Sequence, residues 1–200
     1  LVEAGALKRR QSNVDEIGGF TNLWFSDHDW ALQTAPQPGL NGRSLTINQG
    51  RIVGGSSALN AMMYVRCHSG DYALLEQRGG SQWNADAVAW AFAGLENYLD
   101  GPAPGRCQTG LMQVRNCPDA SSYSAEFQGA ARELGYKAGD WDYNGIVQEA
   151  GAGPLQFNID SHGHRHSAFN AYLEPILGSA HLTVVADHAA QSLLWHDHHT

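Results

Sequence analysis

The sequence of 200 residues predicts a mixed α/β fold. Short runs of alternating or uniformly apolar residues, which are typical of strands, occur near both ends and in the middle of the chain. Between them lie amphipathic runs that begin with capping residues, and these predict helices. Apolar residues make up 42% of the chain, so a chain of this length can bury a core as one domain or as two small ones.

The first fifty residues are dominated by strand and turn signals. Leu1–Gly5 reads as a short buried strand closed by glycine, and residues 5–15 read as a polar loop. Residues 31–34 and 44–53 alternate as strands do, and the sequence PQPGLNGR between them holds two turn signals, Pro-Gly and Asn-Gly. Residues 17–29 have aromatic residues at mixed spacing and receive no assignment.

The middle of the chain predicts a short helical segment and a longer helix. Residues 58–64 are long enough for one or two helical turns, with Ser57 as the cap. Residues 83–98 predict a full helix, because Asn84 is a good N-cap and the apolar residues recur at helical spacing.

Two more helices are predicted in the second half. Residues 121–134 form the first, with Ser122 or Ser124 as the cap and a glycine at its end. Residues 167–177 form the second, capped by Ser167 and bent or ended by a proline.

The second half also contains three strand signals. Residues 111–115, 154–160 and 181–195 are rich in β-branched and other apolar residues, and the last run is long enough for two strands. Residues 137–153 between them read as a long, turn-rich loop. Loops of this length suggest a function beyond connection.

Charge and composition exclude some classes of partner. The formal net charge is −8, so we expect no nucleic-acid binding, and association with a membrane is not indicated. No apolar run approaches the roughly 20 residues that span a bilayer. Three cysteines without metal-ligand spacing fit a reducing compartment, so we expect a cytoplasmic protein. The chain begins in a strand-like run without Met, and we expect a fragment truncated at both ends.

The stretch QGRIVGGSSALNAMMYVR, residues 49–66, contains the clearest functional signal. One reading is structural: Gly54-Gly55 forms a bulge or tight turn that lets a helix pack on a strand. The other is that bare amides and serine hydroxyls at the start of a helical turn face an anion or an electron-rich ring. In that case Arg51 is a fixed countercharge for a phosphate.

Residues 50–72 resemble the first signature of the glucose–methanol–choline (GMC) oxidoreductases, which are FAD-dependent enzymes. That signature resembles G-R-x-L-G-G-S-S-x-x-N-x-x-x-Y-x-R-G followed by D-Y, and the one clear departure is Cys67, where glycine is usual. Further landmarks of the family follow in order over essentially the whole chain. The residues of PQPGLNGR and of the signature are most similar to those of the choline dehydrogenases and alcohol dehydrogenases within the family.

The resemblance implies a flavin site with named residues. Along the FAD diphosphate and ribityl chain it places Gly54, Gly55, Ser56 and Ser57, and beside the isoalloxazine ring it places Asn60, Ala61, Met62 and Met63. Glu3, at the end of a Rossmann-like strand, would accept the ribose hydroxyls of the adenosine, although five residues alone would make it a surface acid. Some members tether FAD through a histidine, whose position Leu59 occupies here, so non-covalent FAD is implied.

The resemblance also implies the domain organisation. It predicts a partial Rossmann-like FAD-binding domain interleaved with a substrate domain that is based on an antiparallel sheet. Residues 1–72 would belong to the FAD-binding portion, with the cofactor-contacting loop at 50–66. Residues 73–177 would be mainly substrate domain and connecting segments, and residues 178–200 would return to the FAD-binding domain.

The activity implied is the oxidation of a small-molecule alcohol to an aldehyde or ketone by hydride transfer to flavin N5, with oxygen or a quinone as acceptor. The family's catalytic base lies near the C-terminus of the complete protein, so no catalytic residue is nominated here and the fragment itself is expected to be inactive. Two alternatives stay open: an FAD-dependent lyase or light-driven decarboxylase of the same family, and a non-catalytic, truncated or degenerate copy.

Two clusters of histidines suggest a third class, a metal-binding protein. These are His162, His164 and His166, and then His196, His198 and His199. Histidine clusters can bind zinc, but we interpret both as solvated turns and predict no metal site. A redox pair of Cys107 and Cys117 is not favoured either.

Overall fold

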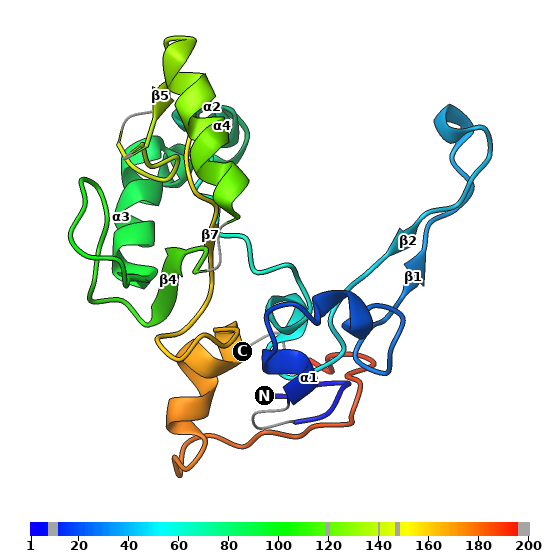
Figure 1. Cartoon of the computed structure of the whole chain (residues 1–200). Coiled ribbons are helices and arrows are strands. Elements are labelled where there is room, and N and C mark those ends of the chain that lie inside the picture. The colour runs from blue at the N-terminus through cyan, green and yellow to red at the C-terminus, as the bar shows by residue number, and fades with distance from the viewer. Residues whose placement is uncertain (8–11, 119–120, 140, 147–148, 196–200) are drawn as a thin grey trace. The chain divides into compact units, whose positions relative to one another are not determined.

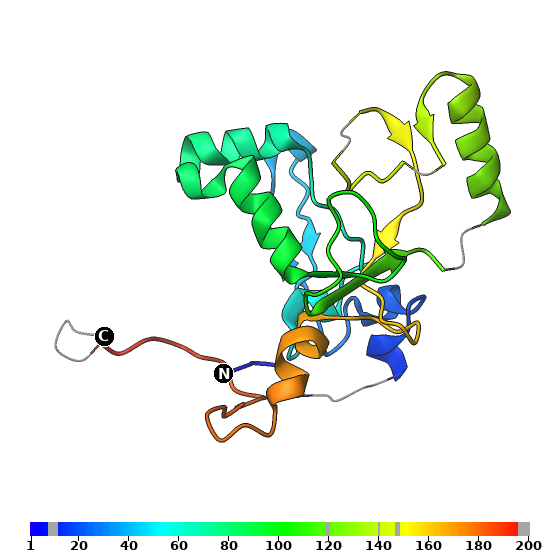
Figure 2. The same ribbon diagram turned by 90° about the vertical axis from the view of Figure 1, so that its left-hand side faces the viewer.

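The computed structural model describes residues 1–7, 12–118, 121–139, 141–146 and 149–195. The chain divides into two compact units. Unit 1 comprises Leu1–Ala61 and Arg165–Thr200, and unit 2 comprises Met62–His164. Helices and short sheets occur together (Figures 1 and 2), which confirms the predicted mixed class, and unit 2 is inserted into unit 1 as interleaving requires. Which unit binds FAD and which binds substrate stays a prediction.

Unit 1 carries a β-hairpin that extends away from the rest of that unit (Figure 1). Its strands are β1, Leu32–Gln33, and β2, Thr46–Ile47, which pair antiparallel with Leu32 opposite Ile47. At the tip, a 3₁₀ turn at Pro38–Leu40 is followed by Asn41 in the left-handed conformation. The hairpin and its turn are confirmed where the sequence predicted two alternating strands joined by Pro-Gly and Asn-Gly.

The N-terminal residues of unit 1 run parallel to a late segment of the chain. Val2 forms a parallel bridge with Val185. The Glu3 amide donates to the Val185 carbonyl at 3.0 Å, and the Val185 amide donates to the Leu1 carbonyl at 2.9 Å. The expected buried strand at Leu1–Gly5 is therefore only a short extended pairing. It is also not buried, because Leu1 and Val2 are more than half exposed.

A small apolar cluster holds the core of unit 1. Its members are Val14, Leu23, Ile52, Ala58 and Leu59. Val14 comes from α1, Ser12–Asp15, a turn of helix inside the polar stretch that the sequence interpretation treated as loop. Leu23 comes from a 3₁₀ turn at Phe20–Leu23 within the stretch left unassigned. Single apolar residues in polar stretches therefore complete this core.

The predicted helix over residues 167–177 is present in a distorted form. It consists of a π-helical segment, Phe169–Leu173, followed by a 3₁₀ turn, Glu174–Ile176. The hydroxyl of Ser167 accepts a hydrogen bond from the Asn170 amide at 3.4 Å, in keeping with its predicted place at the start. Pro175 lies in the first part of the 3₁₀ turn, where the backbone amide has no partner within the turn, so the missing hydrogen of proline removes no hydrogen bond.

Unit 2 contains two neighbouring helices, α2 and α3, which lie at an angle to each other (Figure 2). The first, α2 at Ser69–Gly79, was not predicted, although a capping box marks its start: His68 accepts from Gly70 and Asp71 accepts from His68. The second, α3 at Ala85–Leu95, has the predicted Asn84 cap, whose side-chain oxygen accepts from the Ala87 amide at 2.8 Å. It ends three residues earlier than predicted.

The residues that follow α3 belong to the main sheet of unit 2. The strands are β3, Glu96–Tyr98; β4, Met112–Asn116; and β7, Gln156–Phe157, in the order β3-β4-β7. β3 pairs parallel with β4, and β4 pairs antiparallel with β7. The predicted strands near 111–115 and 154–160 are confirmed, and the predicted last turn of the helix is strand β3 because Glu96 and Tyr98 are buried there.

The last part of unit 2 packs a helix on a two-stranded sheet. The helix is α4, Ser122–Glu133, and its cap is Ser121 rather than the predicted Ser122 or Ser124, with the Ser121 hydroxyl accepting from Tyr123 at 3.3 Å. The strands are β5, Lys137–Ala138, and β6, Gly151–Ala152, which pair parallel. The predicted long loop is therefore closed at both ends by strand pairing.

Among the residues described, no helix has both the length and the apolar character that crossing a membrane requires.

Candidate functional site

The glycine loop, residues 50–61, lies wholly in unit 1 and follows directly from the hairpin. Its start is held by backbone contacts: the Arg51 amide donates to the His28 carbonyl at 2.7 Å, and the Val53 amide donates to Ala6 at 3.2 Å. Ile52 forms a parallel bridge with Ala6. The loop therefore leaves the hairpin beside the N-terminal segment that contains Glu3.

The loop turns through two glycines in the left-handed conformation. Gly54 has a φ of 104° and Gly55 a φ of 58°, values that L side chains rarely adopt. A single 3₁₀ turn follows at Gly55–Ala58. The predicted helical turns at 58–64 are therefore wrong: the helical turn begins earlier, because the glycines reverse the chain before Ser57.

The glycines in and around this loop have two different roles. A Cβ on Gly50 would lie 2.3 Å from the Gly55 carbonyl, and one on Gly54 would lie 3.0 Å from Cβ of Phe169. A Cβ on Gly5 would lie 1.8 Å from the Arg51 carbonyl oxygen. These three allow close packing, as the structural reading of the stretch expected. At Gly55 a Cβ would meet none of the described atoms within 4 Å, so open space adjoins this residue alone among the four.

Both serine hydroxyls of the loop take part in its internal hydrogen bonding. Ser56 Oγ accepts from the Gly50 amide at 3.1 Å. Ser57 Oγ donates to the Gly54 carbonyl at 2.6 Å and accepts from the Ala168 amide at 2.9 Å. The hydroxyl hydrogen of Ser56 is not used in these bonds, whereas that of Ser57 is. Ser56 is therefore the better donor to a bound group.

Arg51 places a cation at the start of the loop. Its guanidinium carbon lies 5.7 Å from the centre of the Trp30 ring. Its Nε is buried and has no hydrogen-bond partner in the part of the chain that the structure describes. A buried N–H without a partner is costly, so this atom is a candidate for contact with a bound anion.

Arg165 reaches the other end of the loop from a distant part of the chain. It is 1% exposed, and its Nη1 donates to the carbonyls of Ser57 and Asn60 at 3.1 and 2.7 Å and to Asn60 Oδ1 at 3.0 Å. Its Nε donates to the Val14 carbonyl at 2.8 Å. Burial lowers the pKa of Arg165 to about 10, against a smaller opposing effect of Asp15.

The structure brings most of the predicted site residues into one unit, with two exceptions. The unit 1 group consists of Glu3, Arg51, Gly54, Gly55, Ser56, Ser57, Asn60 and Ala61. Met62 and Met63 begin unit 2, where Met63 bridges Phe157 and the Met62 carbonyl accepts from Asn158 at 2.8 Å. Glu3 accepts a hydrogen bond from the Gly5 amide at 2.8 Å through Oε1.

At the base of the hairpin, Asp29 accepts hydrogen bonds from residues that precede and follow the two strands. The carboxylate is 6% exposed and accepts from the amides of Phe25, Ala31 and Gln49 and from the Asn48 side chain. Burial alone would raise the pKa of Asp29, but the four hydrogen bonds outweigh it and lower the pKa to about 2. Asp29 therefore fixes the point from which the glycine loop departs.

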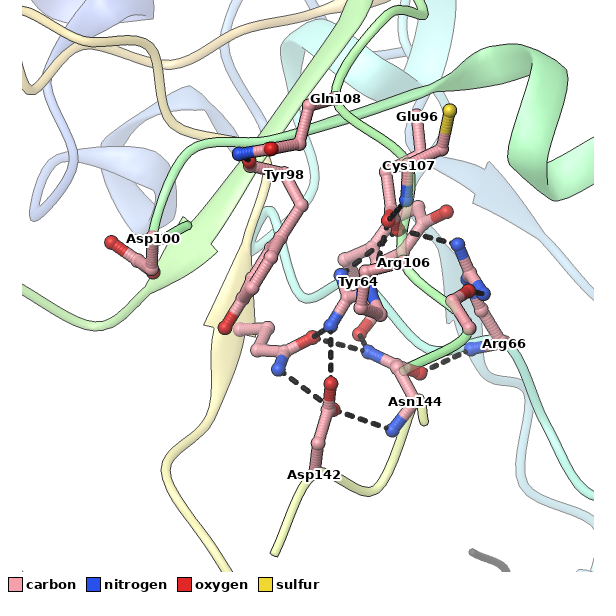
Figure 3. A network of polar contacts seen from close by, with 12 residues as sticks. Tyr64, Arg66, Glu96, Tyr98, Asp100, Arg106, Cys107, Gln108, Asp142 and Asn144 are labelled. Atoms are coloured by element: carbon pink, nitrogen blue, oxygen red, sulfur yellow. Dashed lines mark hydrogen bonds and ion pairs between the residues drawn. The ribbon is translucent and has the colours of Figure 1, made fainter. Parts of the chain in front are cut away.

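Unit 2 contains a buried polar network that no sequence pattern indicated (Figure 3). Arg106 lies at its centre: Nε and Nη2 each contact a Glu96 oxygen at 2.9 Å, and Nη1 contacts Asp142 at 2.7 Å and Gln156 at 2.8 Å. Arg66 adds a second cation, with Nη2 2.9 Å from Glu96. Two arginines and two carboxylates therefore balance in charge.

Backbone contacts tie this network to the chain entering unit 2. Asn144 donates to the Tyr64 carbonyl at 2.9 Å and accepts from the Arg66 amide at 2.7 Å. Burial raises the pKa of Tyr64 to about 12, with a further contribution from Glu96. Burial would lower the pKa of Arg106, but its hydrogen bonds to Glu96 and Asp142 raise it. Near neutral pH Tyr64 is therefore uncharged and Arg106 is positively charged, and this fixed state suits a structural role.

The first histidine cluster is only partly the solvated turn that was expected. The side chains of His162 and His164 are 71% and 50% exposed, beside Asp160. Arg165 and His166, however, are buried, which corrects the prediction. Within the described ranges, no group of three ligand-type side chains could hold a metal ion, and all three cysteines are free. His196, His198 and His199 lie outside the described residues.

Sequence reasoning missed Arg165, Asp29 and the network around Arg106. An arginine within HGHRH reads as part of a polar turn, and only its burial against carbonyls more than 100 residues away reveals its role. Asp29 offered a weak signal, because an aspartate before a strand often accepts backbone amides. Arg106 offered none, since its partners come from three distant segments.

Comparison with known proteins identifies relatives over most of the chain. A family model described as GMC oxidoreductase matches residues 3–200. The oxygen-dependent choline dehydrogenase of Brucella anthropi is 35% identical over 167 residues, which cover 84% of this chain and 30% of that protein. The enzyme of the same description from Photobacterium profundum is 37% identical over 158 residues, covering 78% and 27%. The chain thus spans about 30% of the length of the curated relatives it matches.

Solved structures show the same fold. Pyridoxine 4-oxidase from Mesorbium loti matches with a TM-score of 0.80 and 25% identity, over 93% of this chain and 36% of that one. A formate oxidase matches with a TM-score of 0.78 and 20% identity, over 93% and 33%. The fold of this chain therefore occurs within larger oxidases.

Proposed function

Because this chain belongs to the GMC oxidoreductase family, we propose that it forms part of the FAD site of an enzyme that oxidises an alcohol. The observation that carries the proposal is Gly55, a left-handed residue at the start of a 3₁₀ turn with open space where a side chain would lie. Bare backbone at the start of a helical turn is the arrangement that binds phosphate groups.

The residues of the glycine loop fit a dinucleotide in their chemistry. Gly54, Gly55, Ser56 and Ser57 would line the diphosphate and the ribityl chain. The left-handed glycines support this role because they let backbone approach a ligand closely. Of the two hydroxyls, Ser56 has its hydrogen uncommitted in the bonds described above, so we assign it the direct contact.

Arg51 and Glu3 would hold the charged and hydroxylated parts of the cofactor. Arg51 supports a phosphate contact through its buried Nε, which lacks a partner within the described residues. Glu3 lies in the segment that runs beside the loop through the Ala6–Ile52 bridge, and its second carboxylate oxygen would accept ribose hydroxyls.

Asn60, Ala61, Met62 and Met63 would pass the isoalloxazine ring, where donors favour the charge of the reduced form. We infer that FAD is bound non-covalently. Leu59 occupies the position of the histidine that tethers FAD in some members, and its alkyl side chain, buried in the core of unit 1, cannot form that bond. Residues 1–72 and 178–200 would be FAD-binding, and residues 73–177 mainly substrate domain and connecting segments.

Bound FAD would supply the hydride acceptor for alcohol oxidation. Relatives described as oxygen-dependent choline dehydrogenases favour a choline-like small alcohol as substrate and oxygen as acceptor. We assign no residue of this chain the role of the base that takes the alcohol proton. A lyase or decarboxylase of the same family would share the cofactor site and differ in that chemistry.

The test compares a glycine in the loop with a glycine in the hairpin turn, both in the left-handed conformation and both with open space where a side chain would lie. Gly55 and Gly42 both have positive φ, 58° and 75°, and a Cβ at either would meet no described atom within 4 Å. In the natural protein that contains residues 1–200, Gly55→Val should weaken FAD binding at least about tenfold, measured by titration of flavin absorbance, by filling the space beside the loop.

Gly42→Val, in the hairpin turn, carries the same backbone strain and should leave FAD affinity unchanged. Equal losses in both variants would attribute the effect to strain and remove the support that Gly55 gives. A wild-type protein that binds no flavin would overturn the proposal itself.

A further inference from the structure

The side chain of Arg165, which lies outside the glycine loop, bonds the carbonyls of both Ser57 and Asn60 in the turn that follows Gly55. We propose that Arg165 is the positioning residue of this loop: its guanidinium fixes the carbonyls of Ser57 and Asn60, and thereby the orientation of the amides that precede them. The functional meaning rests on the proposed FAD site, because that loop is where the cofactor would bind.

The contacts of Arg165 reach two separate parts of unit 1. Nη1 bonds the carbonyls of Ser57 and Asn60, Nε bonds Val14, and the Arg165 amide donates to Asp15 at 2.9 Å. The residue therefore links the end of α1 to the loop. Without it, carbonyls at both positions of the loop would lose their buried donor.

The burial of this cation indicates that its place is specific. Arg165 is 1% exposed, and its Nε and Nη1 donate to carbonyl and amide oxygens, which carry no charge. Its Nη2 is unbonded within the described part of the chain. A buried guanidinium with incomplete hydrogen bonding is costly to fold. A lysine could not replace it, because a single ammonium cannot reach Val14 and the loop together.

The residues after Arg165 support the same loop independently. The Ala168 amide donates to Ser57 Oγ at 2.9 Å, and Phe169 packs its Cβ 3.0 Å from the place of a Gly54 Cβ. The segment 165–169 thus contacts the loop at Gly54, Ser57 and Asn60. Arg165 supplies the charged part of this support, and the backbone and Phe169 supply the rest.

The experiment measures the loop in the absence of FAD, so that it does not depend on the cofactor. Hydrogen–deuterium exchange is followed by mass spectrometry in peptides covering residues 54–61, in the natural protein. Arg165→Lys should raise exchange in this loop about tenfold while peptides of unit 2 stay unchanged, because local opening needs only the loss of local contacts.

Two further variants complete the test. In Arg165→Ala, a few millimolar guanidinium chloride should restore protection of residues 54–61, whereas sodium chloride at the same concentration should not. Arg106→Lys is the matched control: another buried arginine, in unit 2, whose loss should leave exchange of the glycine loop at the wild-type rate.

FAD affinity measured on the same proteins separates the two proposals. Faster exchange in the Arg165 variants together with weaker FAD binding supports the positioning role. Faster exchange with no flavin binding even in the wild-type protein would keep Arg165 as an organiser of the loop and reject the FAD site. Unchanged loop exchange in both Arg165 variants would overturn the inference.

Discussion

Arg106 and Glu96 form a bidentate ion pair in which neither side chain is exposed to solvent, with both nitrogen–oxygen distances 2.9 Å. The Tyr98 ring lies against the guanidinium, 3.8 Å from its centre. Because Asp142 and Gln156 satisfy the third nitrogen, the pair is complete. Completeness matters here, since a buried charge that loses its partner is far more costly than a pair that was never formed.

Arg106→Met should therefore destabilise unit 2 by about 3 to 5 kcal/mol, because it removes the cation shared by Glu96, which is fully buried, and Asp142, whose side chain is 20% exposed. The measurement is the free energy of unfolding in urea. Lys137→Ala is the control, because the Lys137–Glu149 pair is 3.5 Å apart with both side chains more than half exposed. Its loss should change stability by less than about 1 kcal/mol. Similar losses in both variants would contradict the role of burial.

Asp29 should make unit 1 sensitive to acid. Its folded pKa of about 2 lies below the ordinary 3.8, so its contribution to stability is present above about pH 4 and is lost as pH falls through about 2. The contribution is on the order of 2 kcal/mol near neutral pH. We expect Asp29→Asn to lower the unfolding free energy at pH 6 and to flatten its decline between pH 4 and pH 2.

Asp27→Asn is the matched control for this pH series, because Asp27 is exposed and lies two residues away. That variant should keep the wild-type acid profile. If Asp29→Asn kept it as well, the acid sensitivity would come from other carboxylates.

The sequence predicted the local elements better than the contacts that join them. Helix α3 and the hairpin turn follow from neighbouring residues, Asn84 for the one and Pro-Gly and Asn-Gly for the other. Helix α2 was missed because its apolar residues, such as Leu74 and Leu75, are exposed and form no periodic apolar face. Its start is marked only by the capping box of His68 and Asp71. Periodicity indicates burial, and this helix has little of it.

The glycine loop was found by its pattern, but its conformation was not. A motif indicates which residue types a ligand needs. It does not indicate which of its glycines serve packing, as Gly50 and Gly54 do, and which adjoins open space, as Gly55 does. The packing of Gly54 depends on Phe169, which arrives from more than 100 residues away. Long-range contacts of this kind leave no local signal in a single sequence.

Cys67 shows how a departure from the family pattern is expressed in structure. The residue has a φ of 64°, a left-handed conformation in which a side chain costs about 1 to 2 kcal/mol. Glycine, which is usual there in the family, would remove that strain while gaining some freedom in the unfolded chain. We expect Cys67→Gly to raise the unfolding free energy of unit 2 by about 0.5 to 1 kcal/mol.

Cys117→Gly is the comparison for this substitution, because Cys117 is not among the residues with positive φ and its amide bonds the Leu155 carbonyl at 2.9 Å. There, glycine relieves nothing and should destabilise by roughly 0.5 to 1 kcal/mol. A stability loss in both variants would show that the strain at Cys67 is absent in solution.

Gly5 lets the N-terminal segment lie directly against the start of the glycine loop. A Cβ there would lie 1.8 Å from the Arg51 carbonyl oxygen and 2.6 Å from the Ile52 nitrogen, both backbone atoms that no side-chain rotation can move. Gly5→Ala should therefore separate the N-terminal segment from the loop, break the Ala6–Ile52 bridge, and cost about 3 kcal/mol or more. Thermal unfolding and hydrogen exchange of residues 50–54 measure both effects.

Gly18→Ala separates this clash from the general effect of adding a methyl group. Gly18 lacks a positive φ, and its Cβ would meet no described atom within 4 Å, so alanine there should leave stability unchanged or slightly higher. If Gly5→Ala melted at the temperature of Gly18→Ala, the close approach of the two backbones would be absent in solution. The loop would then need another anchor, and the exchange data on residues 50–54 would show whether Arg51 and Ile52, which lie nearest to the added methyl group, had moved.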